Sequence, residues 1–201
     1  MKLNLTLKFI HSNSLNCRFL TKCRLVHSRL LDWVRNERKR FEELVKEVCI
    51  IVVLLGAGGK EIRKRRNIAK KLRDNGIIAL IPEDDFAPDI APSLIEEFIF
   101  KHSDVDLVFI NVESWGSATE FAQFHDDTRI APKLRVLTFH KYHPLYGSSM
   151  SYLSDLYLTH IAKYGHVYAY DDKEESNFPS SEKIILTISI RYKFLRALGK
   201  V

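Results

Sequence analysis

Five short apolar runs, each separated from the next by a helical pattern, constrain the fold of this chain more than any other feature. The first run is almost continuously apolar, as expected for a central strand buried on both faces of a parallel sheet. The predicted strands are residues 49–55, 77–81, 106–112, 135–139 and 166–170. The alternation predicts an α/β fold with a doubly wound parallel five-stranded sheet, a flavodoxin/Rossmann-like three-layer sandwich with strand order 2-1-3-4-5.

Three segments describe the organisation of the chain. Residues 1–28 form a basic extension, ordered or disordered, and six Lys or Arg but no acidic residue precede Asp32. Residues 29–47 carry apolar side chains at helical spacing and are expected to form an amphipathic helix, an N-terminal helical extension of the fold. Residues 48–201 hold the whole strand and helix pattern, so we expect them to form a single α/β domain.

Charge is the most unusual bulk property, with a formal net charge of +6 and a pI of about 9.2. Nucleic acid or another acidic surface could bind the N-terminal segment or the second basic run, residues 60–73. In the second run, Ile62, Ile68 and Leu72 mark an apolar helix face, and no aromatic residues interleave with the basic ones. A solvated helix face is therefore the simpler interpretation, and nucleic acid stays open as the alternative.

The cysteines and the hydropathy exclude several classes of protein. The three cysteines lack CxxC spacing, which argues against a disulfide framework or a zinc site, and Cys49 is expected to be a core thiol. The longest apolar run, residues 48–57, is strand-sized, whereas a membrane-spanning helix needs about 20 residues. We expect a cytoplasmic protein with no transmembrane segment, no metal and no bound cofactor.

Polar and glycine-rich segments follow four of the predicted strands. In an open α/β sheet, ligands bind in the crevice beyond the carboxyl ends of the strands, so these segments should border one site. The candidate residues are Gly56, Gly58, Gly59, Asp84, Asp85, Ser114, Trp115, Gly116, Ser117, Glu120, His140 and Tyr142.

The glycines after the first strand would let backbone amides approach a phosphate, or would simply make a tight strand-to-helix turn. A dinucleotide fingerprint would need glycine in place of Glu61, and the GK[ST] of a P-loop is absent, so both classes are rejected. Asp84 and Asp85 could bind ribose hydroxyls or assist proton transfer, or could belong to a solvated acidic loop. His140 and Tyr142 could form a wall for an aromatic base.

Glu120 has two competing explanations. It follows the segment Ser114-Trp115-Gly116-Ser117, which links a predicted buried strand to a predicted helix. A capping box with Ser117 as N-cap and Glu120 at N3 would explain the spacing. Alternatively, its carboxylate could meet a sugar or a nucleotide at the sheet edge.

Residues 81–98, 103–112 and 114–120 together resemble the layout of TIR-type domains and of the nucleoside 2-deoxyribosyltransferase-like family. In those families an acidic loop, a helix and a strand lead to a turn and a helix with a catalytic Glu. The Gly116-Ser117 pair is similar to the Gly-Thr or Gly-Ser pair before the transferase Glu. The glycine-rich turn is more similar to LOG/SLOG nucleotide-binding proteins, although their Gly-Gly-x-Gly-Thr signature is absent.

The resemblance covers residues 48–139 and implies specific roles. Glu120 would act as nucleophile or stabilise the transition state at the anomeric carbon, Asp84 or Asp85 would orient the sugar, and Ser114 and Trp115 would line the pocket. The implied function is an N-glycosidase or deoxyribosyltransferase, that is a hydrolase or glycosyltransferase, acting on a nucleoside or NAD as substrate. A homo-oligomer is also implied. The alternative is a non-catalytic nucleotide-binding sensor or a protein-interaction module.

Overall fold

The computed structural model describes residues 13–86, 92–102 and 104–201, with side chains from residue 27 onward. The chain divides into two compact units, one ending at Glu47 and the other spanning Val48–Val201. The described part of the first unit is a single helix, α1 (Asn13–Glu47), which begins well before the expected residue 29. Residues 1–12 of the expected basic extension lie outside the described residues. None of the described helices is both long enough and apolar enough to cross a bilayer.

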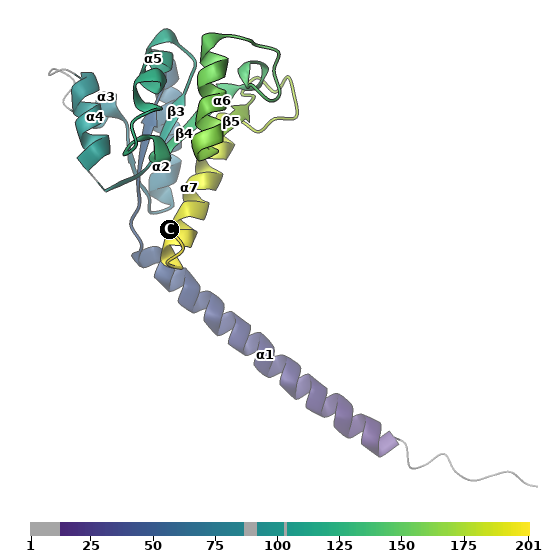
Figure 1. Ribbon diagram of the computed structural model, residues 1–201. Coiled ribbons are helices and arrows are strands. Elements are labelled where there is room, and N and C mark those ends of the chain that lie inside the picture. The colour runs from purple at the N-terminus through teal and green to yellow at the C-terminus, as the bar shows by residue number, and fades with distance from the viewer. Residues whose placement is uncertain (1–12, 87–91, 103) are drawn as a thin grey trace, which may run out of the picture. The chain divides into compact units, whose positions relative to one another are not determined.

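The second unit is built on a five-stranded sheet (Figure 1). Its strands are β1 (Ile51–Leu55), β2 (Ile78–Leu80), β3 (Val105–Asn111), β4 (Leu134–Phe139) and β5 (Val167–Tyr170). Every neighbouring pair is parallel, and the order is β2-β1-β3-β4-β5. The doubly wound, flavodoxin-like arrangement predicted from the sequence is confirmed. The carboxyl ends of β1 and β3 lie side by side, because Leu55 pairs with Ile110.

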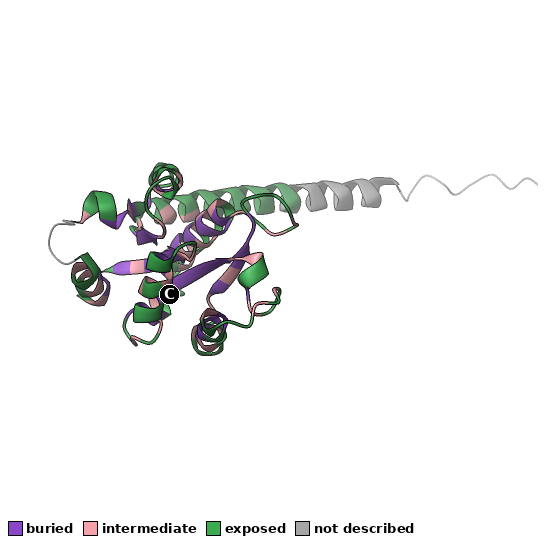
Figure 2. Ribbon diagram, turned by 90° about the horizontal axis from the view of Figure 1, so that it is seen from above, coloured by how far each residue is buried: buried purple, intermediate pink, exposed green. Residues whose placement is uncertain are grey.

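The helices of this unit form two layers around the sheet. They are α2 (Glu61–Asp74), α3 (Pro82–Asp85), α4 (Pro92–His102), α5 (Trp115–Phe124), α6 (Tyr152–Tyr164) and α7 (Ser181–Ala197), with 3-10 turns η1 (Ala131–Lys133) and η2 (His140–Tyr142). Successive strand residues point to opposite faces. Leu54 therefore packs with Ile68 of α2 and Ile185 of α7, whereas Leu55 packs with Phe100, Phe121 and Tyr157 of α4, α5 and α6. Figure 2 shows the buried residues concentrated on the strands and on the helix sides that face them.

Two local expectations differ from the structure. Cys49 is exposed rather than buried in the core, because β1 begins only at Ile51. The acidic segment expected to be a loop begins with the helical turn α3, in which Pro82 occupies the first position, where its missing N–H costs no hydrogen bond. Residues 87–91 of the same segment lie outside the described residues.

Candidate functional site

The glycine segment makes the turn from β1 into α2. Gly56 has φ +155, and a Cβ there would lie 3.4 Å from the carbonyl oxygen of Asn111 at the end of β3. Gly59 has φ +65, in the left-handed region that glycine adopts without strain. The space around Gly58 is open, and the N-cap residue of α2, Lys60, makes no side-chain capping bond. The segment is therefore a tight turn that leaves the amides of a helix N-terminus uncapped by a side chain, which suits an anion.

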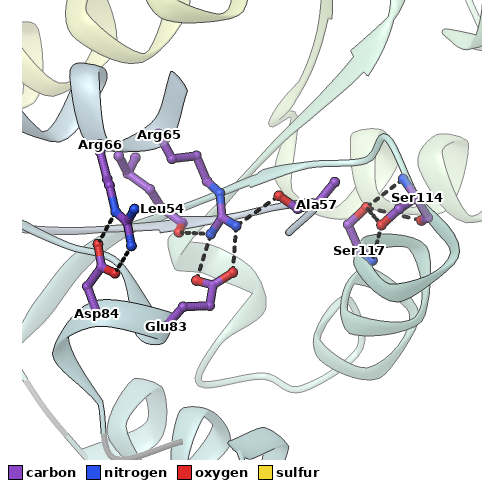
Figure 3. A network of polar contacts seen from close by, with 8 residues as sticks. All are labelled: Leu54, Ala57, Arg65, Arg66, Glu83, Asp84, Ser114 and Ser117. Carbon is purple, nitrogen blue, oxygen red and sulfur yellow. Dashed lines mark hydrogen bonds and ion pairs between the residues drawn. The ribbon is translucent and has the colours of Figure 1, made fainter. Parts of the chain in front are cut away.

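The capping box of α5 is formed by two serines, not by Ser117 and Glu120. Ser114 is the N-cap, with an extended backbone, and its Oγ accepts from the amide of Ser117 at 3.2 Å. In return the amide of Ser114 donates to Oγ of Ser117 at 3.0 Å (Figure 3). The capping interpretation of Glu120 is thus wrong. The helix starts three residues earlier than that interpretation required, so Glu120 lies one turn further along α5.

Glu120 is half-buried, and its carboxyl group is poorly satisfied. Its Oε2 atom is buried and has no hydrogen-bond partner among the described residues. Burial raises the pKa of Glu120 to about 7, with further contributions from the negative charges of Glu96 and Glu83, while Arg65 opposes the rise. A carboxyl group held in this way carries a proton about half of the time near neutral pH.

Two further glutamates, Glu83 of α3 and Glu96 of α4, complete what we call the glutamate cluster with Glu120. Glu96 is only 8% exposed. Burial raises its pKa to about 7, with a contribution from Glu83. Each member comes from a different helix. The negative charge of Glu83 contributes to the raised pKa values of both Glu96 and Glu120, and that of Glu96 to the pKa of Glu120, so the three carboxyl groups lie close enough to interact electrostatically.

Arg65 of α2 is the cation that binds Glu83, one member of the glutamate cluster. It is 6% exposed and donates two hydrogen bonds to the carboxylate of Glu83, at 2.8 and 2.5 Å. It also donates to the carbonyl oxygens of Leu54 at 3.3 Å and Ala57 at 2.9 Å (Figure 3). One side chain therefore joins α2, α3, the end of β1 and the glycine segment. Arg65 pairs with Glu83, and no described cation forms an ion pair with Glu96 or Glu120.

The predicted acids Asp84 and Asp85 lie elsewhere. Asp84 accepts two hydrogen bonds from Arg66, at 2.8 and 2.5 Å, and this contact lowers its pKa. Asp85 accepts from the amide of Ile81 at 2.7 Å and stabilises the start of α3. Neither has a described contact with Glu120, and it is their neighbour Glu83 that reaches the cluster.

The remaining predicted residues do not converge on Glu120. Trp115 is 91% exposed at the start of α5, and Gly116 beside it is exposed as well. His140 stacks on Phe178, with ring centroids 5.2 Å apart, beyond the end of β4, and Tyr142 is exposed. No described contact joins His140 or Tyr142 to the glycine segment or to the glutamate cluster.

A second polar feature lies at the same edge, on the side of α2 and α7. A cavity of about 20 Å³, enough for about one water molecule, is lined in part by Gly56, Asn111 and Glu113. The hydroxyl of Tyr170 donates to Glu113 at 2.7 Å, as does the side-chain amide of Asn111, also at 2.7 Å. The other amide atom, Oδ1 of Asn111, is buried without a partner among the described residues. The polar edge thus continues from the glycine segment to the ends of β3 and β5.

Sequence reasoning missed Arg65, Glu83 and Glu96. A signal existed for Arg65, because it occupies the same face of α2 as Ile62 and Ile68, where an apolar residue is expected. Glu96 carries no such signal, because its spacing of three residues from Ser93 is that of a capping box.

Two coupled carboxyl groups with raised pKa values can share one proton, so that one acts as an acid while the other is ionised. Within the described residues no group of three or more His, Cys, Asp or Glu side chains is arranged to hold a metal ion.

No family model matches the chain, and no curated protein matches it.

Proposed function

We propose that this chain is an enzyme that cleaves the N-glycosidic bond of a nucleoside or nucleotide, by hydrolysis or by transfer of the sugar. The observation that carries the proposal is the state of Glu120. Its carboxyl group is not used in a helix cap, has a buried oxygen without a described partner, and titrates near neutral pH beside Glu96. Such perturbed carboxyl groups are common at catalytic sites and costly elsewhere.

The chemistry requires one acid and one carboxylate. The bond between the anomeric carbon and the base nitrogen breaks, its electron pair leaves with the base, and positive charge develops on the sugar. The ionised glutamate stabilises that charge or attacks the anomeric carbon to form a glycosyl ester, which water or an acceptor then opens. The protonated glutamate donates its proton to the departing base. We assign the carboxylate role to Glu120 and the acid role to Glu96.

Two further features favour a nucleotide as the substrate. The open space at Gly58, next to the uncapped N-terminus of α2, suits a phosphate group. The resemblance of residues 81–120 to nucleoside 2-deoxyribosyltransferase-like and TIR-type domains agrees with a carboxylate in the position of Glu120. NAD and deoxynucleosides are therefore the first substrates to examine, and a cytoplasmic location would give access to both.

The direct test uses chromatography to measure the free base that the protein releases from a panel of nucleosides, deoxynucleotides and NAD. Glu120→Gln should lower kcat by about 100-fold or more, and Glu96→Gln by a similar factor for substrates with a poor leaving group. Glu97→Gln is the matched control, because Glu97 is adjacent to Glu96 but pairs with Lys101. It should retain activity. Full activity of Glu120→Gln, or no base release from any substrate by the wild type, would contradict the proposal.

The pH dependence gives a second test of the same proposal. If Glu96 and Glu120 share one proton, kcat/KM should follow a bell-shaped curve centred near pH 7. Activity falls at lower pH because both groups are protonated, and at higher pH because both are ionised. Glu96→Gln should remove the fall at high pH, since the acid is then absent and only the carboxylate of Glu120 titrates. A profile that is flat from pH 5 to 9 would exclude the shared proton.

A nucleotide-binding protein without turnover is the second candidate, supported by the glycine segment alone. Gly58→Asp places a carboxylate in open space near the amides of α2 and should abolish nucleotide binding measured by calorimetry. In this case Glu120→Gln should bind as tightly as the wild type, and neither protein should release base. Base release by the wild type would exclude this candidate.

A further inference from the structure

Helix α1 carries an apolar seam that its own unit leaves open. Leu30, Val34, Phe41 and Leu44 follow alternating spacings of four and three residues once Glu37 is included between Val34 and Phe41. This is the repeat of a helix that packs against another helix. Leu30 is 54% exposed, Val34 48% and Leu44 41%, so these three side chains of the seam are largely uncovered, whereas Phe41 is partly buried.

An uncovered seam of this length is unfavourable for a helix in water. Amphipathic helices are stabilised mainly by the packing of their apolar side, and this seam spans about 20 Å at 1.5 Å per residue. Leu31, which is 42% exposed, and Val45 widen the seam on one side, and Trp33, which is 59% exposed, widens it on the other. Both faces of the sheet in the α/β unit are already covered by that unit's own helices.

The charges along the part of α1 that carries most of the seam favour a protein partner over a membrane or nucleic acid. Residues 32–47 contain five acidic and five basic side chains. A membrane-surface helix carries mostly Lys and Arg on its polar side, and a nucleic-acid-binding helix is likewise basic. In addition, Glu37 lies in the middle of the seam, where a helix inserted into lipid would have to bury its charge.

We propose that the seam of α1 binds the same seam of a second copy of this chain, in antiparallel orientation. A parallel pair would place the two Glu37 carboxylates opposite each other. In an antiparallel pair with Val34 opposite Leu44 of the second copy, each Glu37 lies opposite Phe41 and among the Arg38 and Arg40 side chains of the two helices. The register also places Leu31 near Val45 of the second copy.

The charge pattern makes this seam self-complementary. Arg38 already binds Glu42 of its own helix at 2.8 Å, whereas neither Arg40 nor Glu37 has an ion-pair partner among the described residues. A single polar residue in an apolar seam typically fixes the register and the number of strands of a coiled coil. In α1 that residue is Glu37, and its counterion is an arginine of the partner helix.

The test uses the full-length chain in sedimentation equilibrium over a range of concentrations. The wild type should reach twice the monomer mass of 23.4 kDa. Val34→Asp should raise the dissociation constant by about 100-fold or more, because each dimer would bury two unpaired charges. Asn36→Asp adds the same charge on the opposite side of α1 and should leave the dimer intact. The thermal midpoint of the α/β unit should not change in either variant.

Several results would overturn the proposal. A monomeric wild type would overturn it. If Val34→Asp then lowered the thermal midpoint of that monomer, the seam would pack on the chain's own α/β unit. If Val34→Asp instead lost binding to vesicles, the seam would bind a membrane. A Val34→Asp protein that remains dimeric, or an Asn36→Asp protein that dissociates equally, would exclude the seam as the interface.

Disulfide trapping tests the orientation separately. Val34→Cys and Leu44→Cys are made singly in a chain whose native cysteines, Cys17, Cys23 and Cys49, are replaced by serine. Antiparallel pairing predicts a crosslinked dimer when the two variants are mixed and oxidised, and little from either alone. Crosslinking of Val34→Cys with itself would show parallel pairing, and no crosslink in any sample would exclude the proposed register.

Discussion

Replacing Glu120 with glutamine should make the folded protein more stable above neutral pH. A carboxyl group whose pKa is higher in the folded than in the unfolded state binds more protons when folded, so stability falls as pH rises between the two pKa values. For Glu120 this window runs from 4.5 to about 7. Glutamine has nearly the same shape but cannot ionise, and the variant therefore escapes this loss.

The structure sets the size of the effect. Moving a pKa from 4.5 to about 7 corresponds to about 3 kcal/mol at 1.36 kcal/mol per pH unit. This is an upper limit, because Glu120 is only half-buried and solvent screens part of the cost of its charge. We expect Glu120→Gln to gain about 1–3 kcal/mol over the wild type at pH 8, and less than about 1 kcal/mol at pH 5.

Urea unfolding at pH 5 and pH 8 measures this difference directly. With a slope of about 2 kcal/mol/M for a domain of this size, the midpoint at pH 8 should rise by about 0.5–1.5 M. Asp126→Asn is the matched control, because Asp126 lies near the end of the same helix but pairs with Lys163 at the surface, and it should give no gain. If the wild type and Glu120→Gln lose stability equally between pH 5 and pH 8, the raised pKa of Glu120 is refuted.

Three other substitutions test the contacts that position the site. Arg65→Met should cost about 1–3 kcal/mol in urea unfolding, because the carbonyl oxygens of Leu54 and Ala57 lose this donor, whereas Arg66→Met, on the exposed side of α2, should be close to neutral. Ser114→Ala should lower stability by about 1 kcal/mol through loss of the N-cap, measured in the same way. Gly147→Ala should lower the thermal midpoint by several degrees, because its Cβ would lie 2.0 Å from the carbonyl oxygen of Lys141 and force the loop to move; an unchanged midpoint would contradict this.

The sheet could be predicted from the sequence because its strands carry a strong local signal. A run such as Ile51–Leu55 is apolar at every position, and a helix pattern follows it, which leaves a parallel sheet as the simplest arrangement. The strand order then followed from the common topology of such folds. The start of α1 was harder to predict, because residues 13–28 lack the regular spacing of residues 29–47.

The site could be predicted only in part. The position of Glu120 after a predicted strand marks it as a candidate, but local sequence does not determine the helix cap, since a Ser-x-x-Ser box at Ser114 competes with a Ser-x-x-Glu box at Ser117. Glu83 cannot be distinguished from Asp84 and Asp85 by sequence, because the directions of three successive acids in one helical turn depend on where that turn begins. The pairing of Arg65 with Glu83 depends on how α2 and α3 pack together, which local sequence does not determine.

Base release by the wild type and by Glu120→Gln, compared at pH 7 on nucleosides, deoxynucleotides and NAD, tests the central claim most directly. The account predicts that the wild type frees a base from at least one of these substrates, and that Glu120→Gln, although folded and more stable at pH 8, loses that activity by about 100-fold or more. Equal release by the two proteins, or no release by either, would contradict it.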